Sequence, residues 1–169
     1  MNMQIAITGR GGQGVLFLTR LLGECALELG REAISAETHG MAMRGGSVFS
    51  TLKVGSFLSP LIRNGQADVL LALDPETIET DLILLSPRGI AFLNSREPGR
   101  NGAVDATGLA SGLGHPLAAN LVLLGFALGR GGMFCHLPLV ESVTGRMSPG
   151  RARDLNLEAL RLGFGQARR

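Results

Sequence analysis

The sequence predicts an α/β fold: a three-layer sandwich around a mostly parallel sheet, with a Rossmann-like first βαβ unit. Short β-branched or apolar runs alternate along the chain with segments whose apolar residues recur at helical spacing. Residues 67–73 (ADVLLAL) are almost continuously apolar, as is typical of a parallel strand buried on both faces. A glycine-rich turn joins the first strand to the first helix.

The first strand is expected over residues 4–8 (QIAIT), and Gly9 ends it. A helix is predicted to follow from Gly14, because apolar residues then recur every three or four positions. Gly30 is expected to close this helix as the residue just beyond its last turn. The buried face of the helix is predicted to contain Leu18, Leu22, Cys25 and Leu29.

Residues 33–37 (AISAE) predict the second strand, and residues 47–54 (SVFSTLKV) predict a third, half-exposed strand. Asp74 and Pro75 have the pattern of a helix cap followed by proline at the first helical position, so a helix is expected through about residue 85. The remaining elements are expected to be strands at 90–93 and 103–105 around a polar loop, and helices starting at Pro116, Pro138 and Arg151.

The length and composition fit one domain over residues 1–169. A chain of this length buries about two thirds of the surface that its unfolded form exposes. Hydrophobic residues make up 45% and charged residues only 18%, against a usual value of roughly 25% for charged residues. We therefore infer that part of the apolar surface is covered by another chain. The alternative is a free monomer with small, well-buried helices.

The charge and cysteine content exclude several functional classes. The net charge is +2, which is too small for a polycationic nucleic-acid binder. Cys25 and Cys135 are far apart, so this chain by itself has no CxxC framework for a metal or an iron-sulfur cluster. The amino terminus lacks a leader pattern, and no apolar run is long enough for a membrane span. We expect a cytoplasmic protein with reduced thiols.

The first glycine loop, residues 9–14, satisfies the pattern GxGxxG between a strand and a helix. Glycines allow a close approach to the backbone, and free N–H groups at a helix start favour a phosphate. The residues that this interpretation assigns to a cofactor are Gly9, Gly11, Gly12, Gln13 and Gly14. The alternative is that these glycines let the helix pack tightly against its strand. In a dinucleotide-binding fold, an acidic residue about 20 positions on would bind the ribose, and Glu37 is near that distance.

The second glycine stretch, residues 38–46, reads THGMAMRGG. Its glycines would let a ligand or a partner backbone approach closely, and its methionines can adapt to an irregular apolar surface. Arg44 can bind a phosphate or a carboxylate. His39 has no acid or second histidine in the stretch, so no catalytic role is assigned to it. The residues predicted to form this interface or ligand loop are Glu37, His39, Gly40, Met41, Met43, Gly45 and Gly46.

Three motifs together resemble the gamma subunit of 2-oxoacid:ferredoxin oxidoreductases. They are GRGGQG after the first strand, ETHGMAMRGGS after the second, and SPLI followed by ADVLLALDP. The variants most similar in pattern act on indolepyruvate, 2-oxoglutarate or related 2-oxoacids such as pyruvate. The resemblance continues through Asn94-Ser95, HPLAANLVLLGFAL and ARDLNLEALRLGFGQA, and so covers nearly the whole chain. Arg10 departs from the family pattern, which often has a small or apolar residue there.

The resemblance implies a subunit of an enzyme that oxidatively decarboxylates a 2-oxoacid onto coenzyme A and passes electrons to ferredoxin. Thiamine diphosphate, magnesium and iron-sulfur clusters are expected in the alpha, beta and delta parts, because this chain lacks both the GDG motif with its Asn pair and the cluster cysteines. The isolated chain is expected to be inactive, without catalytic or metal-binding residues.

Two roles for the glycine loops stay open at this point. Coenzyme A could place its diphosphate over residues 11–14 and its ribose phosphate on Arg44. Alternatively, Arg44 and Arg10 could pair with carboxylates of the alpha or beta subunit. Two further alternatives for the whole chain are a free NAD(P)-dependent oxidoreductase and a ligand-free interaction module.

Overall fold

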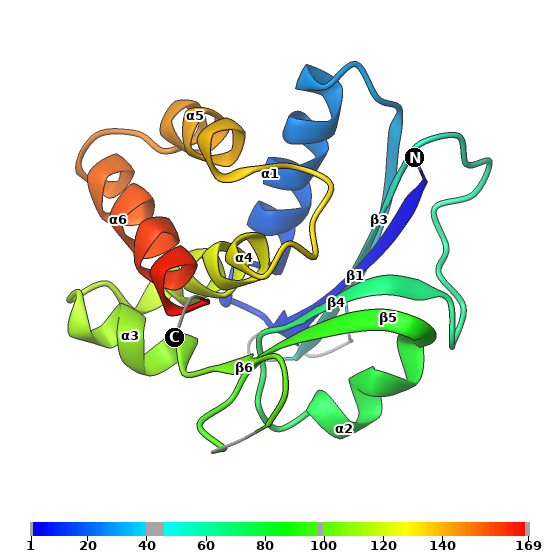
Figure 1. The fold of residues 1–169 in the computed structure, drawn as a ribbon, viewed down its shortest axis with the longest axis horizontal. Coiled ribbons are helices and arrows are strands. Elements are labelled where there is room, and N and C mark those ends of the chain that lie inside the picture. Colours follow the sequence, from blue (N-terminus) through cyan, green and yellow to red (C-terminus); the bar gives the residue numbers. More distant parts are fainter. Residues whose placement is uncertain (1, 40–45, 98–99, 168–169) are drawn as a thin grey trace.

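The computed structural model describes residues 2–39, 46–97 and 100–167. Within these ranges the chain forms a six-stranded sheet in the order β2-β3-β1-β4-β5-β6 (Figure 1). The strands are β1 (Met3–Arg10), β2 (Ala33–His39), β3 (Ser47–Val54), β4 (Ala67–Ala72), β5 (Leu85–Asn94) and β6 (Ala103–Val104).

The sheet is mostly parallel, as predicted. Strands β1, β4, β5 and β6 pair in parallel, whereas β3 is antiparallel to both of its neighbours, β1 and β2. β2 therefore points the same way as β1, but β3 lies between the two strands of the first βαβ unit. The prediction that β3 is half exposed is wrong, because most of its residues are buried. Its place between two other strands explains this burial.

Helices cover the two faces of the sheet unequally (Figure 1). Five lie on one side: α1 (Val15–Glu28), α3 (Ala106–Gly112), α4 (Ala119–Gly129), α5 (Leu137–Met147) and α6 (Arg151–Gln166). In the described part of the chain, the other side has only α2 (Ile78–Asp81), the 3₁₀ turn η1 (Leu82–Leu84) and a loop. A second 3₁₀ turn, η2 (Pro116–Ala118), precedes α4.

The alternating side chains of the strands divide the core into two clusters, as the pleat requires. Ile5 and Ile7 of β1 face the large cluster, which α1, α4, α5 and α6 complete. Ala6 faces a small cluster that includes Ile62 and Ile78. The third layer of the predicted sandwich is thus thin. No helix within the described residues is long and apolar enough to cross a bilayer.

The segment after Asp74 differs from the prediction. The expected helix through residue 85 is reduced to α2 and η1, and β5 begins at Leu85 instead of residue 90. Pro87 explains the early end, because proline lacks an N–H group and disfavours helical backbone at the residue before it.

Helix α3 was not predicted, because its sequence ATGLASG contains two glycines and little apolar periodicity. Its start is stabilised by Asp105, whose Oδ1 accepts a 2.7 Å hydrogen bond from the Gly108 N–H.

Candidate functional site at the carboxyl edge of the sheet

The carboxyl ends of β1, β4 and β5 bring together three segments that are far apart in sequence. These segments are the first glycine loop, Leu73 with Asp74, and Asn94. β1 and β4 are neighbours from which the chain departs toward opposite edges of the sheet. Open α/β sheets bind ligands at such a switch point. This edge is therefore the candidate site.

The first glycine loop is a tight turn held by its own residues. Gln13 N donates to the Arg10 carbonyl at 3.0 Å, and Gln13 Oε1 accepts from the Arg10 N–H at 2.7 Å. The turn is joined to the start of β3, because Gly11 N donates to the Gly46 carbonyl at 2.9 Å. The end of the second glycine stretch thus lies beside the first loop.

Two glycines of the loop have different roles. Gly14 has a φ of +80° and precedes α1, and a Cβ built on it would lie 2.2 Å from Nδ2 of the buried Asn120. Asn120 donates from this nitrogen to the Gly14 carbonyl at 3.3 Å, which joins α4 to the start of α1. The packing interpretation thus explains Gly14. In contrast, no described atom lies within 4 Å of a Cβ on Gly12 (φ +94°). Gly12 leaves space for a ligand.

We expect Gly14→Ala to lower the free energy of unfolding by about 2 kcal/mol and Gly12→Ala by about 1 kcal/mol. Both substitutions strain a left-handed backbone, which costs roughly 1–2 kcal/mol, but only Gly14→Ala also displaces Asn120. Urea denaturation followed by circular dichroism measures the difference. Equal losses in the two variants would contradict the role assigned to Asn120.

Arg10 pairs with carboxylates of its own chain. Its Nε lies 2.6 Å from Oδ2 of the buried Asp74, and its Nη2 pairs with Glu76. The hydrogen bonds to Asp74 and then to Glu76 are the main reasons that the pKa of Arg10 is raised. Asp74 also accepts a 3.1 Å hydrogen bond from the Glu76 N–H, which closes the turn after β4. The prediction that Asp74 caps a helix is wrong, because α2 begins at Ile78 and its N-cap is Thr77. Arg10 therefore fastens the glycine loop to the turn after β4.

Asn94 joins β5 to β4 and α3. Its Nδ2 donates to the Leu73 carbonyl at 2.9 Å and to Thr107 Oγ1 at 2.8 Å, and its Oδ1 accepts from the Thr107 N–H at 3.1 Å. Thr107 was missed in the sequence because α3 was not predicted. The available signal for this site was a polar residue where each of two neighbouring strands ends, Asp74 after β4 and Asn94 at the end of β5.

Two hollows share Asn94 and Thr107 in their linings. A small cavity of about 130 Å³ is lined by Gly12, Gln13, Leu73, Asn94, Thr107, Pro116, Leu117 and Ala119. A more open one of about 570 Å³ lies over Pro75, Asn94, Ser95, Arg96, Glu97, Asp105 and Thr107. The lining of the small cavity offers amide and hydroxyl groups but no acid, base or thiol. It can hydrogen-bond a ligand, and its side chains cannot exchange a proton with that ligand near neutral pH.

Metal-binding clusters are also absent from the described residues, in which no three His, Cys, Asp or Glu side chains converge.

Glu37 lies in β2, two strands away from the strand that carries the glycine loop. It pairs with Ser50 of β3, and Ser50 pairs with Ile7 of β1, so Glu37 lies two strands away and level with the middle of β1. At about 4.8 Å per strand the separation is roughly 10 Å. The expectation that Glu37 stands where a dinucleotide ribose would bind is therefore wrong. β3, inserted between β1 and β2, is the reason.

β2 continues two residues beyond the predicted end, to His39. The predicted ligand residues Gly40, Met41, Met43, Arg44 and Gly45 lie outside the described residues.

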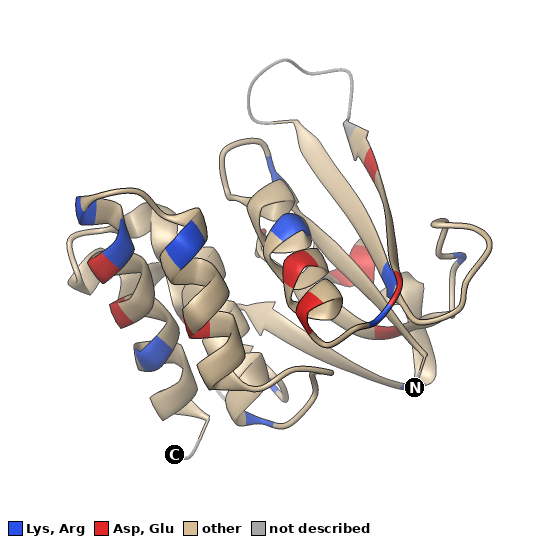
Figure 2. Ribbon diagram, turned by 90° about the horizontal axis from the view of Figure 1, so that it is seen from above, with Lys and Arg blue, Asp and Glu red and all other residues tan. Residues whose placement is uncertain are grey.

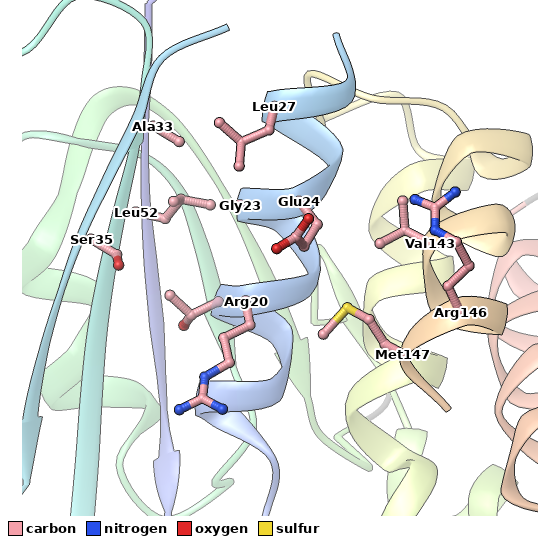
Figure 3. A pocket seen from close by; sticks show the side chains of 11 residues that line it. Arg20, Gly23, Glu24, Leu27, Ala33, Ser35, Leu52, Val143, Arg146 and Met147 are labelled. Atoms are coloured by element: carbon pink, nitrogen blue, oxygen red, sulfur yellow. The ribbon is translucent and has the colours of Figure 1, made fainter. Parts of the chain in front are cut away.

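A separate groove of about 450 Å³ lies between α1, α5 and the β2–β3 side of the sheet (Figure 3). Leu27, Val143 and Met147 contribute apolar surface, and Arg20 and Glu24 project from α1. Arg146 of α5 pairs with Glu28 of α1 across one end. This groove was not predicted, and its charged groups do not converge on a common point in Figure 3.

Comparison with known proteins identifies the family. Residues 4–166 match the family model described as pyruvate ferredoxin/flavodoxin oxidoreductase. The chain belongs to this family. Indolepyruvate oxidoreductase subunit IorB of Archaeoglobus fulgidus is 31% identical, over 99% of this chain and 96% of its own. The corresponding IorB of Methanothermobacter thermautotrophicus is 32% identical, over 99% and 98%.

Solved structures of family members have the same fold. Pyruvate oxidoreductase subunit PORC of Thermotoga maritima superposes with a TM-score of 0.80 at 24% identity, over 97% of this chain and 96% of its own. 2-Oxoglutarate:ferredoxin oxidoreductase of Magnetococcus marinus, solved with 2-oxoglutarate, coenzyme A and succinyl-CoA bound, gives 0.79 at 17% identity, over 99% of this chain and 31% of its own. The resemblance inferred from the glycine motifs is thus confirmed.

Proposed function

We propose that this chain is the gamma-type subunit of a multi-subunit 2-oxoacid:ferredoxin oxidoreductase. Such a complex oxidatively decarboxylates a 2-oxoacid to an acyl-CoA and reduces ferredoxin. The main support is that relatives named as oxidoreductase subunits match from end to end, the Archaeoglobus IorB over 99% of this chain and 96% of its own. In these relatives, a chain of about this length is one complete subunit of the enzyme.

The chemistry is assigned to partner subunits, the alpha and beta subunits and, where present, delta. The small cavity of this chain is lined by amides, a hydroxyl and apolar groups, and the sequence contains two cysteines, too few for an iron-sulfur cluster held by four. Thiamine diphosphate, magnesium and the clusters would belong to those partners. This chain then acts by docking on the partners and positioning them.

We further propose that the carboxyl edge holds part of coenzyme A, which would accept the acyl group. Support comes from the open space at Gly12 and from the start of α1, where Gly14 provides no side-chain cap and the first turn has no acidic residue. Free N–H groups at a helix start favour a phosphate. The cavity of about 130 Å³ is well below the 300–1,000 Å³ of a full small-molecule site, so only one group of the cofactor would fit. Gln13 would contact that group, and Arg44 is proposed for a second phosphate.

Reconstitution tests the subunit role. We expect the complex assembled from all subunits to reduce a viologen dye with coenzyme A and one of indolepyruvate, pyruvate or 2-oxoglutarate. Omitting this chain should abolish the activity, and this chain alone should show none. Dye reduction by the purified chain alone would contradict the proposal.

Thermal unfolding tests the ligand. We expect coenzyme A to raise the Tm, and a ligand at 100 times its Kd stabilises by about 2.7 kcal/mol. NAD and NADP should have no effect, because Glu37 is two strands from the glycine loop. A shift with NAD that Glu37→Ala abolishes would instead support a free dinucleotide-dependent enzyme. If neither coenzyme A nor NAD nor NADP changes the Tm, the coenzyme A proposal is wrong and the chain is a scaffold that binds no cofactor.

A further inference from the structure

We propose that the leucine loop surface, residues 55–66 together with residues 82–88, docks onto another subunit of the same complex. The occupant is a partner face with an apolar hollow bordered by carboxylates. This inference rests on the proposed function, because that function supplies the partner subunits.

The surface presents three large apolar side chains to solvent. Leu58 is fully exposed, Leu61 is 65% exposed and Ile83 is 61% exposed. The two segments are held together by a 2.8 Å hydrogen bond from Gly65 N to the Ile83 carbonyl. Ile62 is 7% exposed and packs inward in the small core cluster, which anchors the loop. Exposed apolar side chains that gather on one surface mark a site of contact with another protein.

The charge of the surface indicates the chemistry of its partner. Residues 55–66 and 82–88 contain two charged side chains, Arg63 and Arg88, and no acid. Both arginines are exposed, and Figure 2 shows the loop after β3 with a single basic segment. Beneath the loop, the buried Lys53 places its Nζ 5.1 Å from the centroid of the Phe57 ring. A complementary face is therefore apolar with carboxylates at its rim.

The charge also favours a different subunit over a second copy of this chain. A two-fold contact places the same patch on both sides of the interface. Such an interface would contain Arg63 and Arg88 of both copies, with no acid of this patch to neutralise them. Like charges brought together across an interface are repulsive.

The position of the surface fits a docking role. On this side of the sheet the described chain provides only α2, η1 and the loop, so a partner would complete the thin third layer (Figure 1). The surface lies where β4 and β5 begin, at Ala67 and Leu85. The glycine loop lies at the opposite, carboxyl edge. A partner docked on the leucine loop surface would leave that edge open to a ligand.

The test compares three variants of the full chain, each co-expressed with the tagged remaining subunits. Leu58→Ser/Leu61→Ser removes the apolar anchors, and Leu27→Ser is the matched control, since Leu27 is 59% exposed on α1. We expect the double variant to bind the other subunits at least 100-fold more weakly and Leu27→Ser to bind as the wild type does. Arg63→Glu/Arg88→Glu should weaken binding about 10-fold and reduce its dependence on salt. Unchanged circular dichroism and Tm of each isolated variant establish folding.

The outcomes separate this inference from the proposed function. If the wild type assembles and Leu58→Ser/Leu61→Ser binds equally well, the docking surface is wrong and the subunit role stands. If the wild type does not bind the other oxidoreductase subunits at all, both proposals fail. Light scattering that shows a dimer of this chain, lost in the double variant, would overturn the choice of partner. A photo-cross-linking residue at position 58 should label an acidic peptide of another subunit, and labelling of this chain's own copies would also overturn that choice.

Discussion

Replacing Gly163 by alanine is expected to lower the free energy of unfolding by about 3 kcal/mol. Gly163 lies in α6 where that helix crosses α4, and a Cβ built on it would be 1.9 Å from the Val122 carbonyl oxygen and 2.7 Å from its carbon. The contact is reciprocal, because a Cβ on Gly125 of α4 would be 2.0 Å from the Leu160 oxygen. The opposing atoms belong to the backbone, so α4 and α6 must move apart to make room for a methyl group. Overpacking of this kind costs typically 1–3 kcal/mol, occasionally more.

The same helix supplies the control. Gly165 is two residues further along α6, and no described atom lies within 4 Å of a Cβ built on it. Gly165→Ala should therefore stabilise by up to about 1 kcal/mol, because alanine has the higher helix propensity. Urea denaturation of both variants tests whether the two substitutions have opposite signs. A loss of similar size at both positions would show that helix propensity, and not the close crossing, determines the effect.

The crossing of α4 and α6 also matters for the candidate site. Asn120 is near the start of α4 and donates to the Gly14 carbonyl, so a displacement of α4 by α6 would reach the start of α1. We expect Gly163→Ala to weaken any ligand binding at the carboxyl edge, although the atoms nearest to a Cβ built on Gly163 belong to Val122 of α4. The close contact of Gly163 with α4 is thus linked to the candidate site through the side chain of Asn120.

The local patterns of the sequence predicted most strands but not their order. Residues 47–54 were predicted with the bounds observed for β3, because their alternation is a local property. Their insertion between β1 and β2 depends on pairing between distant segments, which no local pattern specifies. That insertion both buries β3 and moves Glu37 away from the glycine loop. The prediction of a helix from Asp74 to about residue 85 was wrong for a local reason, because Pro87 ends the helical segment early.

The glycine loop was predicted as a whole, but not the separate roles of its residues. Gly14 must be a glycine because Asn120, 106 residues away, occupies the space that a side chain would need. Arg10 is held by an ion pair with Asp74, 64 residues away. Such partners become visible only when the fold brings them together. The resemblance to the oxidoreductase family came from GRGGQG and HGMAMRGG as motifs, whereas the residues by themselves left ligand and partner contact open.

The stability of the chain is expected to fall steeply with pH above about 9. The pKa of Cys135 is raised, first by its hydrogen bond to Cys25 and second by burial. An unfolded cysteine loses its proton near pH 8.5–9, whereas the folded chain keeps that proton. The folded state therefore binds more protons above this pH, and the free energy of unfolding decreases as pH rises. The limiting slope is about 1.4 kcal/mol per pH unit, or roughly 2–3 kcal/mol between pH 9 and 11.

Few other side chains are of a type that titrates in this pH range, which makes the prediction sharp. The sequence has no Tyr, Lys53 is its only lysine, and Cys25 is its only other cysteine. Arginines stay charged throughout the range, including Arg10, whose pKa is raised by Asp74 and Glu76. Urea denaturation between pH 8 and 11, in the presence of a reductant, should show the slope in the wild type. It should largely disappear in Cys135→Ala but persist in Lys53→Met. If Cys135→Ala keeps the full slope, the protonated thiol pair between α1 and the segment before α5 does not stabilise the fold, and another group must account for the alkaline loss.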